Sequence, residues 1–227
     1  GLTEFQVSVG QVDYYKSLLA EADLEPEMEE HLRELISQKN YFGVEELLKG
    51  QSLSESLSEA FAELPQMFGS AEVLEKAKKL TTNPEALAAV KRLEEIYEIL
   101  KVYGCEKYVA FDFGMLSKFR YYTGIIFRGY TYGTGDAIGK GGRYDNLLAQ
   151  FGKEASASGF TILIDDVLSA LSRQNISISL KEYAYSLLLY KLEDRQNAIP
   201  LVVKLRDAGV RTELVSMTEG KTLEEYL

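Results

Sequence analysis

The chain has a single cysteine and a single histidine, and this scarcity excludes several kinds of chemistry. No intramolecular disulfide can form, which agrees with a reducing compartment such as the cytoplasm. There are too few thiol and imidazole ligands for a zinc site of the usual kind, so we expect no metal and no cofactor. A lone Cys105 is most simply a small core residue, with catalysis as the less favoured alternative. His31 lies in a helical pattern beside Leu32 and Leu35, which indicates a helix-surface residue rather than part of a catalytic triad.

Long apolar runs and an excess of basic residues are also lacking. No stretch of about 18 apolar residues occurs, so we expect no membrane-spanning helix. The first ten residues, GLTEFQVSVG, have neither the basic start nor the apolar centre of a signal peptide. They also lack an initiator methionine, which indicates a piece of a longer protein. The net charge is −10, so the overall field repels nucleic acid, and none is expected as a partner.

The first half of the chain has a helical pattern after a short strand. Residues 3–9 alternate between polar and apolar side chains, which predicts a strand. From about residue 11 to 104 the apolar spacing is helical. Ser52 and Glu55 have the spacing of a capping box. Asn83-Pro84 predicts the start of a helix and Gly104 its end.

The period changes after Gly104 to that of strands. Residues 107–113 and 119–132 predict strands, and the segments DAIGKGGRYDNLL and ASGFTILI predict two more. A helix then begins near Asp165. Strands that follow one another without helices between them favour an antiparallel sheet, so the predicted fold class is α+β.

A second, smaller region follows a linker predicted at residues 174–182. Residues 184–190 and 210–216 predict strands, and a helix predicted over 194–209 separates them. This β-α-β order gives a parallel pair of strands. We therefore expect a large domain over residues 1–173 and the start of a small α/β domain over residues 183–227, cut short within a helix.

The glycine-rich run GTGDAIGKGGR at residues 133–143 invites comparison with a phosphate-binding loop. A P-loop needs four residues between its glycines and a Ser or Thr after the lysine to ligate magnesium. Here three residues separate Gly135 and Gly139, and Gly141 follows Lys140. The better interpretation is that the glycines let two strands turn and a ligand approach the backbone.

A tyrosine cluster is the other candidate for function. Strand alternation places Tyr121 and Tyr122 on opposite faces, with one in the core and the other in a cleft. Tyrosines offer an apolar wall with a polar tip, and Arg143 is a bidentate donor for a carboxylate. Together they suit a small amphoteric ligand such as an amino acid. On composition alone, core tyrosines and a structural ion pair are the favoured interpretation.

Three segments carry a family resemblance: RYYTGIIF, GKGGRYDNLL and GFTILIDDVLSAL (159–171). The first two resemble the paired histidine-recognition motifs of histidyl-tRNA synthetases, RGLDYYTGTVFE and AGGRYDGL. The third is similar to their motif 3, GFAIGLERL. The resemblance implies a class II aminoacyl-tRNA-synthetase-like antiparallel sheet with a helical insertion, followed by the start of a domain like the anticodon-binding one. It implies a histidine site made of Tyr121, Tyr122, Gly141, Gly142, Arg143 and Tyr144.

The resemblance also assigns roles to these residues. Tyr122 and Tyr144 would contact histidine, and Gly141 and Gly142 would allow close backbone approach. Arg143 would hold the loop or a carboxylate. Motifs 1 and 2 of the class II core are absent from the chain, so we expect this piece to bind histidine weakly or not at all.

The departures from the family motifs concern ATP. The motif arginine that contacts the α-phosphate falls on Ser117, and the motif aspartate falls on Arg120. The motif 3 arginine that clamps ATP falls on Asp166, and the glycine of that motif falls on Leu163. An aspartate in place of a phosphate-binding arginine sets one negative charge against another. ATP activation is therefore expected to be lost.

A kept amino-acid pocket without an ATP site is typical of the regulatory subunit family of ATP phosphoribosyltransferase, which the chain resembles most. That resemblance implies a non-catalytic subunit with L-histidine as effector and the short-form catalytic subunit as partner, in the first step of histidine biosynthesis. A homodimer within a hetero-oligomer is expected for the complete protein. The alternatives are a diverged histidyl-tRNA synthetase and another synthetase-like binding paralogue. Residues 183–227 carry six Lys and Arg against seven Asp and Glu, which does not favour an anticodon-binding surface.

Overall fold

The computed structural model describes residues 2–117, 121–178 and 186–226. The chain divides into two compact units, residues 1–177 and residues 178–227. Part of the predicted linker, residues 179–182, lies outside the described residues. Among the described residues, no helix is long and apolar enough to cross a bilayer.

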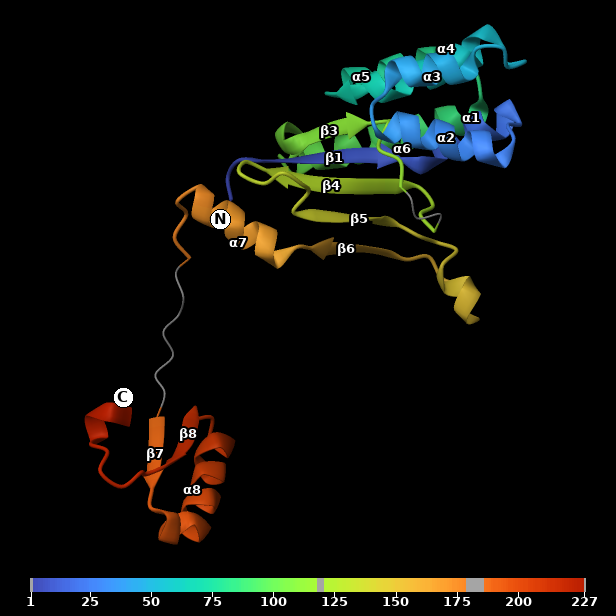
Figure 1. The fold of residues 1–227 in the computed structure, drawn as a ribbon. Helices are drawn as coiled ribbons and strands as arrows, with labels where there is room; N and C mark the ends of the chain where they lie inside the picture. The colour runs from blue at the N-terminus through green and yellow to red at the C-terminus, as the bar shows by residue number, and fades with distance from the viewer. Residues whose placement is uncertain (1, 118–120, 179–185, 227) are drawn as a thin grey trace. The chain divides into compact units, whose positions relative to one another are not determined.

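The larger unit begins with strand β1 (Phe5–Gln11), which runs directly into helix α1 (Val12–Ala22). Helices α2 (Pro26–Ser37), α3 (Tyr41–Leu48), α4 (Glu55–Glu63), α5 (Glu72–Lys79) and α6 (Pro84–Val102) follow, with a short 3₁₀ turn at Leu64–Gln66. Figure 1 shows them gathered at one side of the sheet. The predicted helical region is therefore confirmed except for a two-residue strand, β2 (Phe68–Gly69).

Two helix starts test the capping signals in the sequence. The side chain of Asn83 accepts hydrogen bonds from the backbone N–H groups of Glu85 and Ala86, so the start of α6 is confirmed. Gly104, with φ of 66°, follows the end of this helix as predicted. The expected capping box at Ser52 is wrong, because α4 begins at Glu55 and Ser54 is its cap, bonded to the N–H of Leu57.

The sheet of the larger unit has six strands in the order β2-β3-β1-β4-β5-β6. Besides β1 and β2, they are β3 (Val109–Asp112), β4 (Ile125–Thr131), β5 (Gly139–Arg143) and β6 (Ser158–Ile162). All neighbours are antiparallel except the parallel pair β1–β3. The predicted antiparallel sheet is confirmed. The long strand or hairpin predicted over residues 119–132 is confirmed only from Ile125, where β4 begins, since residues 121–124 are not in a strand and residues 119 and 120 lie outside the described residues.

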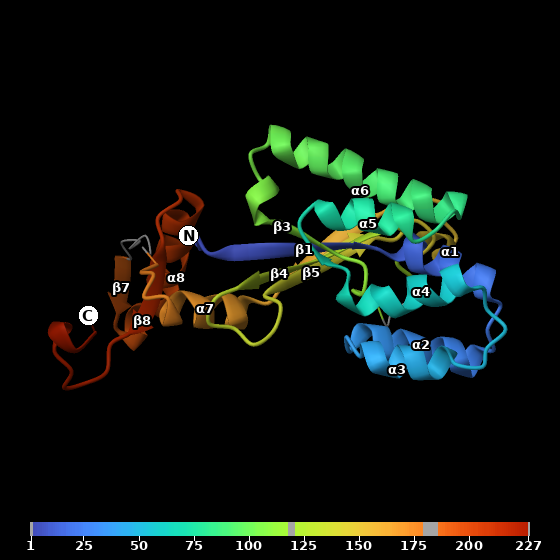
Figure 2. The same ribbon diagram turned by 90° about the horizontal axis from the view of Figure 1, so that it is seen from above.

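Register decides what each face of this sheet contains. Val9 of β1 pairs with Phe127 of β4, and Phe127 pairs with Gly141 of β5. This face packs onto the main hydrophobic core, to which α6 contributes Ala86, Ala89, Val90 and Leu93. Figure 2 shows α6 running along the β1 and β3 side of the sheet. The opposite face carries Ile126, Arg128 and Lys140, and it is the one that matters for function.

A 3₁₀ turn at Leu148–Phe151 lies between β5 and β6, and helix α7 (Ile164–Arg173) follows β6. Gln174, just past α7, donates hydrogen bonds to the hydroxyl of Thr131 and the carbonyl of Tyr132. These bonds fix the end of α7 against the end of β4.

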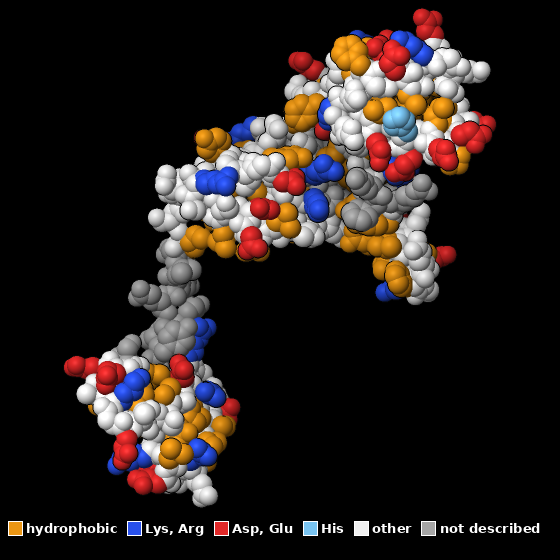
Figure 3. All heavy atoms as spheres, in the orientation of Figure 1, with side chains coloured by type: hydrophobic (Ala, Val, Ile, Leu, Met, Phe, Trp, Pro, Cys, Tyr) orange, Lys and Arg blue, Asp and Glu red, His pale blue; other side chains and the backbone are white. Residues whose placement is uncertain are grey.

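Cys105 is half-buried and lies after α6, so the expectation of a core residue is wrong. His31 is exposed on α2, as expected, and Figure 3 shows the single histidine on the surface.

The smaller unit is a β-α-β arrangement. It contains β7 (Ser186–Tyr190), a 3₁₀ turn at Leu192–Asp194, α8 (Arg195–Asp207) and β8 (Thr212–Ser216). β7 and β8 are parallel neighbours, so the predicted parallel pair is confirmed. The helix predicted to begin near residue 221 is instead a 3₁₀ turn, Leu223–Tyr226.

Candidate functional site

A cavity of about 780 Å³ lies on the sheet face opposite the main core. Its floor is formed by β4, β5 and β6, and its walls by α2, residues 115–117 and the tyrosine segment before β4. This volume is in the range of small-molecule sites. Both acidic and basic side chains line it, among them Glu30, Glu34, Arg33 and Arg128. Such a lining suits a ligand that carries charges of both signs.

Three tyrosines gather at one end of the cavity. The ring centroids of Tyr121 and Tyr122 are 4.5 Å apart, and Tyr144 lies 5.8 Å from the first and 6.3 Å from the second. All three line the cavity. The expectation that Tyr121 and Tyr122 lie on opposite faces of a strand is therefore wrong. The alternation rule fails because both residues precede β4 and are not in a strand.

Backbone hydrogen bonds hold the tyrosine segment although it lies outside a strand. The ammonium group of Lys16 donates to the carbonyl oxygen of Tyr122 at 2.8 Å. The N–H of Thr123 donates to the carbonyl oxygen of Arg143 at 2.8 Å, and the N–H of Val12 donates to that of Gly124 at 3.0 Å. Helix α1 and strand β5 thus fix the segment from two sides.

The hydroxyl of Tyr122 stays protonated over the whole neutral range. Burial, and to a lesser extent the hydrogen bond with Tyr121, raise the pKa of Tyr122 to about 12. The positive charge of Arg128 acts against this rise. The cavity therefore presents a neutral phenol at this end, able to donate one hydrogen bond and accept others.

Glycines 141 and 142 let the tyrosines and the neighbouring strands come close. A Cβ atom on Gly142 would lie 2.7 Å from the Tyr122 ring and 2.7 Å from the carbonyl oxygen of Ile125. A Cβ atom on Gly141 would point to the other face and lie 2.4 Å from the carbonyl oxygen of Gly159. These short distances leave no room for a side chain at either position. A direct role in ligand binding stays a prediction.

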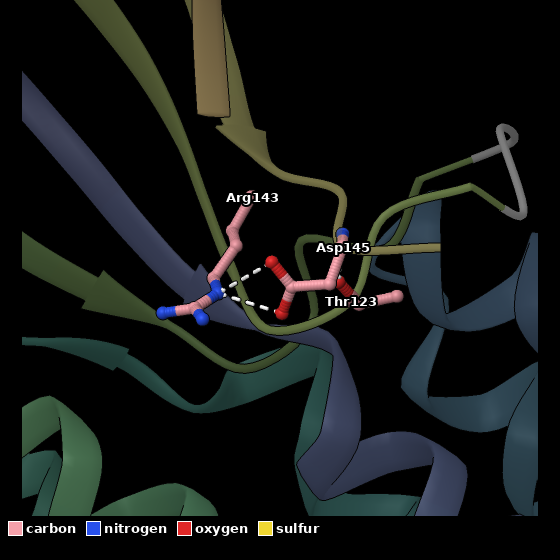
Figure 4. A network of polar contacts seen from close by, with 3 residues as sticks. All are labelled: Thr123, Arg143 and Asp145. Atoms are coloured by element: carbon pink, nitrogen blue, oxygen red, sulfur yellow. Dashed lines mark hydrogen bonds and ion pairs between the residues drawn. The ribbon is translucent and has the colours of Figure 1, made fainter. Parts of the chain in front are cut away.

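Arg143 does not line the tyrosine cavity. It pairs with Ser158 in the face that carries Phe127, and its Nε donates to both carboxylate oxygens of Asp145 at 3.0 and 2.8 Å. The backbone N–H of Asp145 donates to the hydroxyl of Thr123 at 2.7 Å. Figure 4 shows the Arg143–Asp145 ion pair with Thr123 beside it. The Arg143 guanidinium lowers the pKa of Asp145, so this carboxylate stays charged at neutral pH. Of the two roles expected for Arg143, the geometry favours holding the loop.

The positions where the synthetase motifs carry arginine are placed differently. Ser117 lines the cavity, next to Leu116. Asp166 lies in the first turn of α7 and Leu163 precedes this helix, and neither lines the cavity. Arg120 lies outside the described residues. The cavity lining at Ser117 thus contributes a hydroxyl where the motif has a guanidinium.

Several cavity residues were missed by the sequence analysis. Arg33 and Glu30 of α2 form an ion pair at the wall, and Arg128 and Lys140 lie on the floor. Lys140 was considered only as part of a P-loop. Arg128 follows Ile126 by two positions in a strand, and this spacing places both on one face. Glu30 and Arg33 could be identified only from the tertiary structure, because no pattern in the sequence indicates that α2 lies beside the sheet.

Comparisons with known proteins agree with the fold. Residues 1–167 match the family model of histidyl-tRNA synthetase. The ATP phosphoribosyltransferase regulatory subunit of Acetivibrio thermocellus is 39% identical over 214 residues, which are 94% of this chain and 51% of that protein. The chain thus spans about half the length of this curated relative.

Two solved structures resemble the chain. An ATP phosphoribosyltransferase regulatory subunit/histidyl-tRNA synthetase from Bacillus halodurans has a TM-score of 0.71 at 30% identity, covering 100% of this chain and 57% of its own. The HisG:HisZ ATP phosphoribosyl transferase complex from Thermotoga maritima has a TM-score of 0.53 at 20% identity, and the match covers 70% of this chain and 54% of that chain. At the identity of the second, the likeness concerns the fold alone.

Proposed function

Because the chain belongs to the histidyl-tRNA synthetase family, and its curated relative at 39% identity is a regulatory subunit, we propose that it regulates ATP phosphoribosyltransferase. In this role it has no catalysis of its own. It binds L-histidine in the tyrosine cavity and acts in the cytoplasm on a short catalytic subunit in the first step of histidine biosynthesis. The naming of the Thermotoga maritima structure as a complex is consistent with such a partner.

One observation carries the proposal. The cavity keeps three tyrosines at its amino-acid end, but Ser117 stands in its wall where the family motif has an arginine for the α-phosphate. Preorganised positive charge is usually the largest contribution to stabilising a developing negative charge. A site without that charge is suited to holding an amino acid rather than activating it.

The tyrosine end fits an imidazole on physical grounds. The rings of Tyr121 and Tyr144 are nearly perpendicular, at 87°, and give an apolar wall on two sides. The hydroxyl of Tyr122, whose proton is engaged by Tyr121, can accept a hydrogen bond from the N–H of a neutral imidazole. We further propose that residues 174–182 link the larger domain to residues 183–227, the start of an anticodon-binding-like domain.

Calorimetric titration with L-histidine and, separately, with ATP tests the proposal on the protein encoded in full by its gene. We expect binding of histidine and no binding of ATP. Binding of both ligands would favour the alternative of a diverged histidyl-tRNA synthetase. Binding of neither, alone and in the presence of the catalytic subunit, would leave only another synthetase-like binding role.

A variant pair localises the histidine site. Tyr122→Ala removes a cavity ring, and we expect histidine to bind about 10- to 100-fold more weakly, as for truncated aromatic residues at binding sites. Tyr132→Ala is the matched control, since this tyrosine is 71% exposed and does not line the cavity. The catalytic subunit should assemble with both variants. Histidine should inhibit only the complex that contains the control, and equal inhibition of the two complexes would contradict the assignment.

A further inference from the structure

Two cations lie side by side on the cavity floor, beyond the tyrosines. Arg128 of β4 pairs directly with Lys140 of β5 in the antiparallel register. Both line the cavity, and Thr161 of β6 lies directly opposite Lys140. Side chains paired in this way have Cβ atoms about 5 Å apart, and like charges so placed destabilise a sheet. A negatively charged group bound beside Arg128 and Lys140 would offset this repulsion.

Within the described parts of the chain, no carboxylate supplies that charge. Neither Arg128 nor Lys140 takes part in an ion pair or side-chain hydrogen bond there. Arg33 in the cavity wall is different, because its guanidinium is paired with Glu30. Glu30 and Glu34 line the same cavity, but among the described residues neither forms an ion pair with Arg128 or Lys140.

The cation pair lies within reach of a ligand held by the tyrosines. Tyr122 packs against the small cluster of Val12, Met115 and Ile126. Ile126 is two residues before Arg128 in the same strand and on the same face. Two strand residues span about 7 Å, close to the length of a small amino acid. The charge of Arg128 also acts on the Tyr122 hydroxyl, lowering the pKa of that group against the effect of burial. One small molecule can therefore contact both ends.

We propose that Arg128 and Lys140 form an oxyanion subsite that binds the α-carboxylate of the amino acid whose ring lies among the tyrosines. This inference rests on the proposed function and extends it by naming the residues that distinguish an amino acid from analogues without a carboxylate. Arg128 offers a fork of N–H donors to a carboxylate, and Lys140 adds a second positive charge opposite it. Free phosphate shares this chemistry and is the competing source of the oxyanion.

L-Histidinol separates the contributions of ring and carboxylate, since it carries a hydroxymethyl group in place of the carboxylate. The experiment measures the affinities of L-histidine and L-histidinol by calorimetry for the protein encoded in full by its gene. The variants are Arg128→Gln, Lys140→Gln and the double variant, with Arg128→Lys as the conservative change. Lys153→Gln is the matched control, because this lysine is exposed and does not line the cavity.

The unaltered protein should prefer histidine over histidinol by about 100-fold, as two charge-assisted contacts are lost with the carboxylate. Each single Gln variant should weaken histidine binding by about 10-fold, and in the double variant the two ligands should bind within about 3-fold of each other. Arg128→Lys should retain most of the preference, and Lys153→Gln all of it. Folding of each variant is checked by its unchanged affinity for histidinol.

The possible outcomes separate the two levels of the argument. If histidine binds and the preference over histidinol survives in the double variant, the subsite is overturned and the proposed function stands. If inorganic phosphate binds at Arg128 and Lys140 without competing with histidine, the carboxylate assignment is also overturned. Absence of histidine binding to the unaltered protein overturns the proposed function and the subsite together.

Discussion

The glycine-rich segment gives the sharpest test of the fold around the site, through the substitution Gly141→Ala. Gly141 lies in β5, between β4 and β6. An added Cβ atom would lie 2.4 Å from the carbonyl oxygen of Gly159 and 2.7 Å from the Phe127 ring. The first neighbour is backbone of the adjacent strand, so rotation of a side chain cannot relieve the overlap.

The size of the effect follows from these distances. An ordinary contact begins at 3.4 Å, so β5 and β6 must separate locally by about 1 Å. That movement strains the ladder where Gly141 pairs with Phe160. Overpacking of this kind costs about 1–3 kcal/mol, and the smaller entropy of the unfolded alanine chain offsets only about 0.4–1 kcal/mol. For a chain of this length, each kcal/mol lowers Tm by about 2–4 °C.

Gly135→Ala is the matched control in the same glycine-rich run. No atom lies within 4 Å of its added Cβ, and its φ is not in the left-handed region. We expect its free energy of unfolding to stay within about 0.5 kcal/mol of the unaltered protein or to rise slightly. Urea unfolding followed by circular dichroism, with a thermal melt alongside, measures both variants. Equal stability of Gly141→Ala and Gly135→Ala would refute the close approach of β5 and β6.

Three further predictions concern a cap and two ionisable groups. Asn83→Ala removes the acceptor of two N–H groups at the start of α6 and should cost about 1 kcal/mol in urea unfolding; no loss would show that the cap is dispensable. Tyr122 has a pKa near 12 in the folded protein against 10.0 unfolded, so the folded state holds this proton more tightly. Stability should therefore fall as pH rises from about 10 to 12, and Tyr122→Phe should flatten that part of the profile. The hydrogen bond with Arg143 lowers the pKa of Asp145 below its ordinary value of 3.8 in the folded protein. The ionised carboxylate therefore stabilises the folded state above pH 3.8, and this stabilisation is lost as pH falls through the folded pKa. Asp145→Asn should reduce this acid dependence in a pH titration of unfolding, and an unchanged acid limb would contradict the ion pair.

The elements of the fold were largely predictable because their signals are local. Asn83, Pro84 and Gly104 mark the ends of α6 through backbone requirements that neighbouring residues alone fulfil. The same holds for β7 and β8, whose parallel pairing follows from the helix between them. Ser52 was misleading because two serines compete to cap α4, and the choice of Ser54 depends on where the preceding loop lies.

Part of the cavity lining was predictable from the sequence, but its arrangement was not. The motif residues around Tyr122 and Tyr144 identify the family without any coordinates, and both tyrosines line the cavity. The prediction that Tyr121 and Tyr122 point to opposite faces was wrong. Strand alternation does not apply to them, because they precede β4 in a segment held by hydrogen bonds from Lys16 and β5.

The sequence by itself determined most of the order of helices and strands, the family, and the presence of serine at position 117, because each is a property of neighbouring residues or of a linear motif. Tertiary structure alone decided that Arg143 turns away from the cavity to hold Asp145, and that Arg128 stands opposite Lys140 on its floor. Those facts depend on strand register and on which face packs against the core. Register is set by contacts between residues far apart in the chain, so no local pattern contains it.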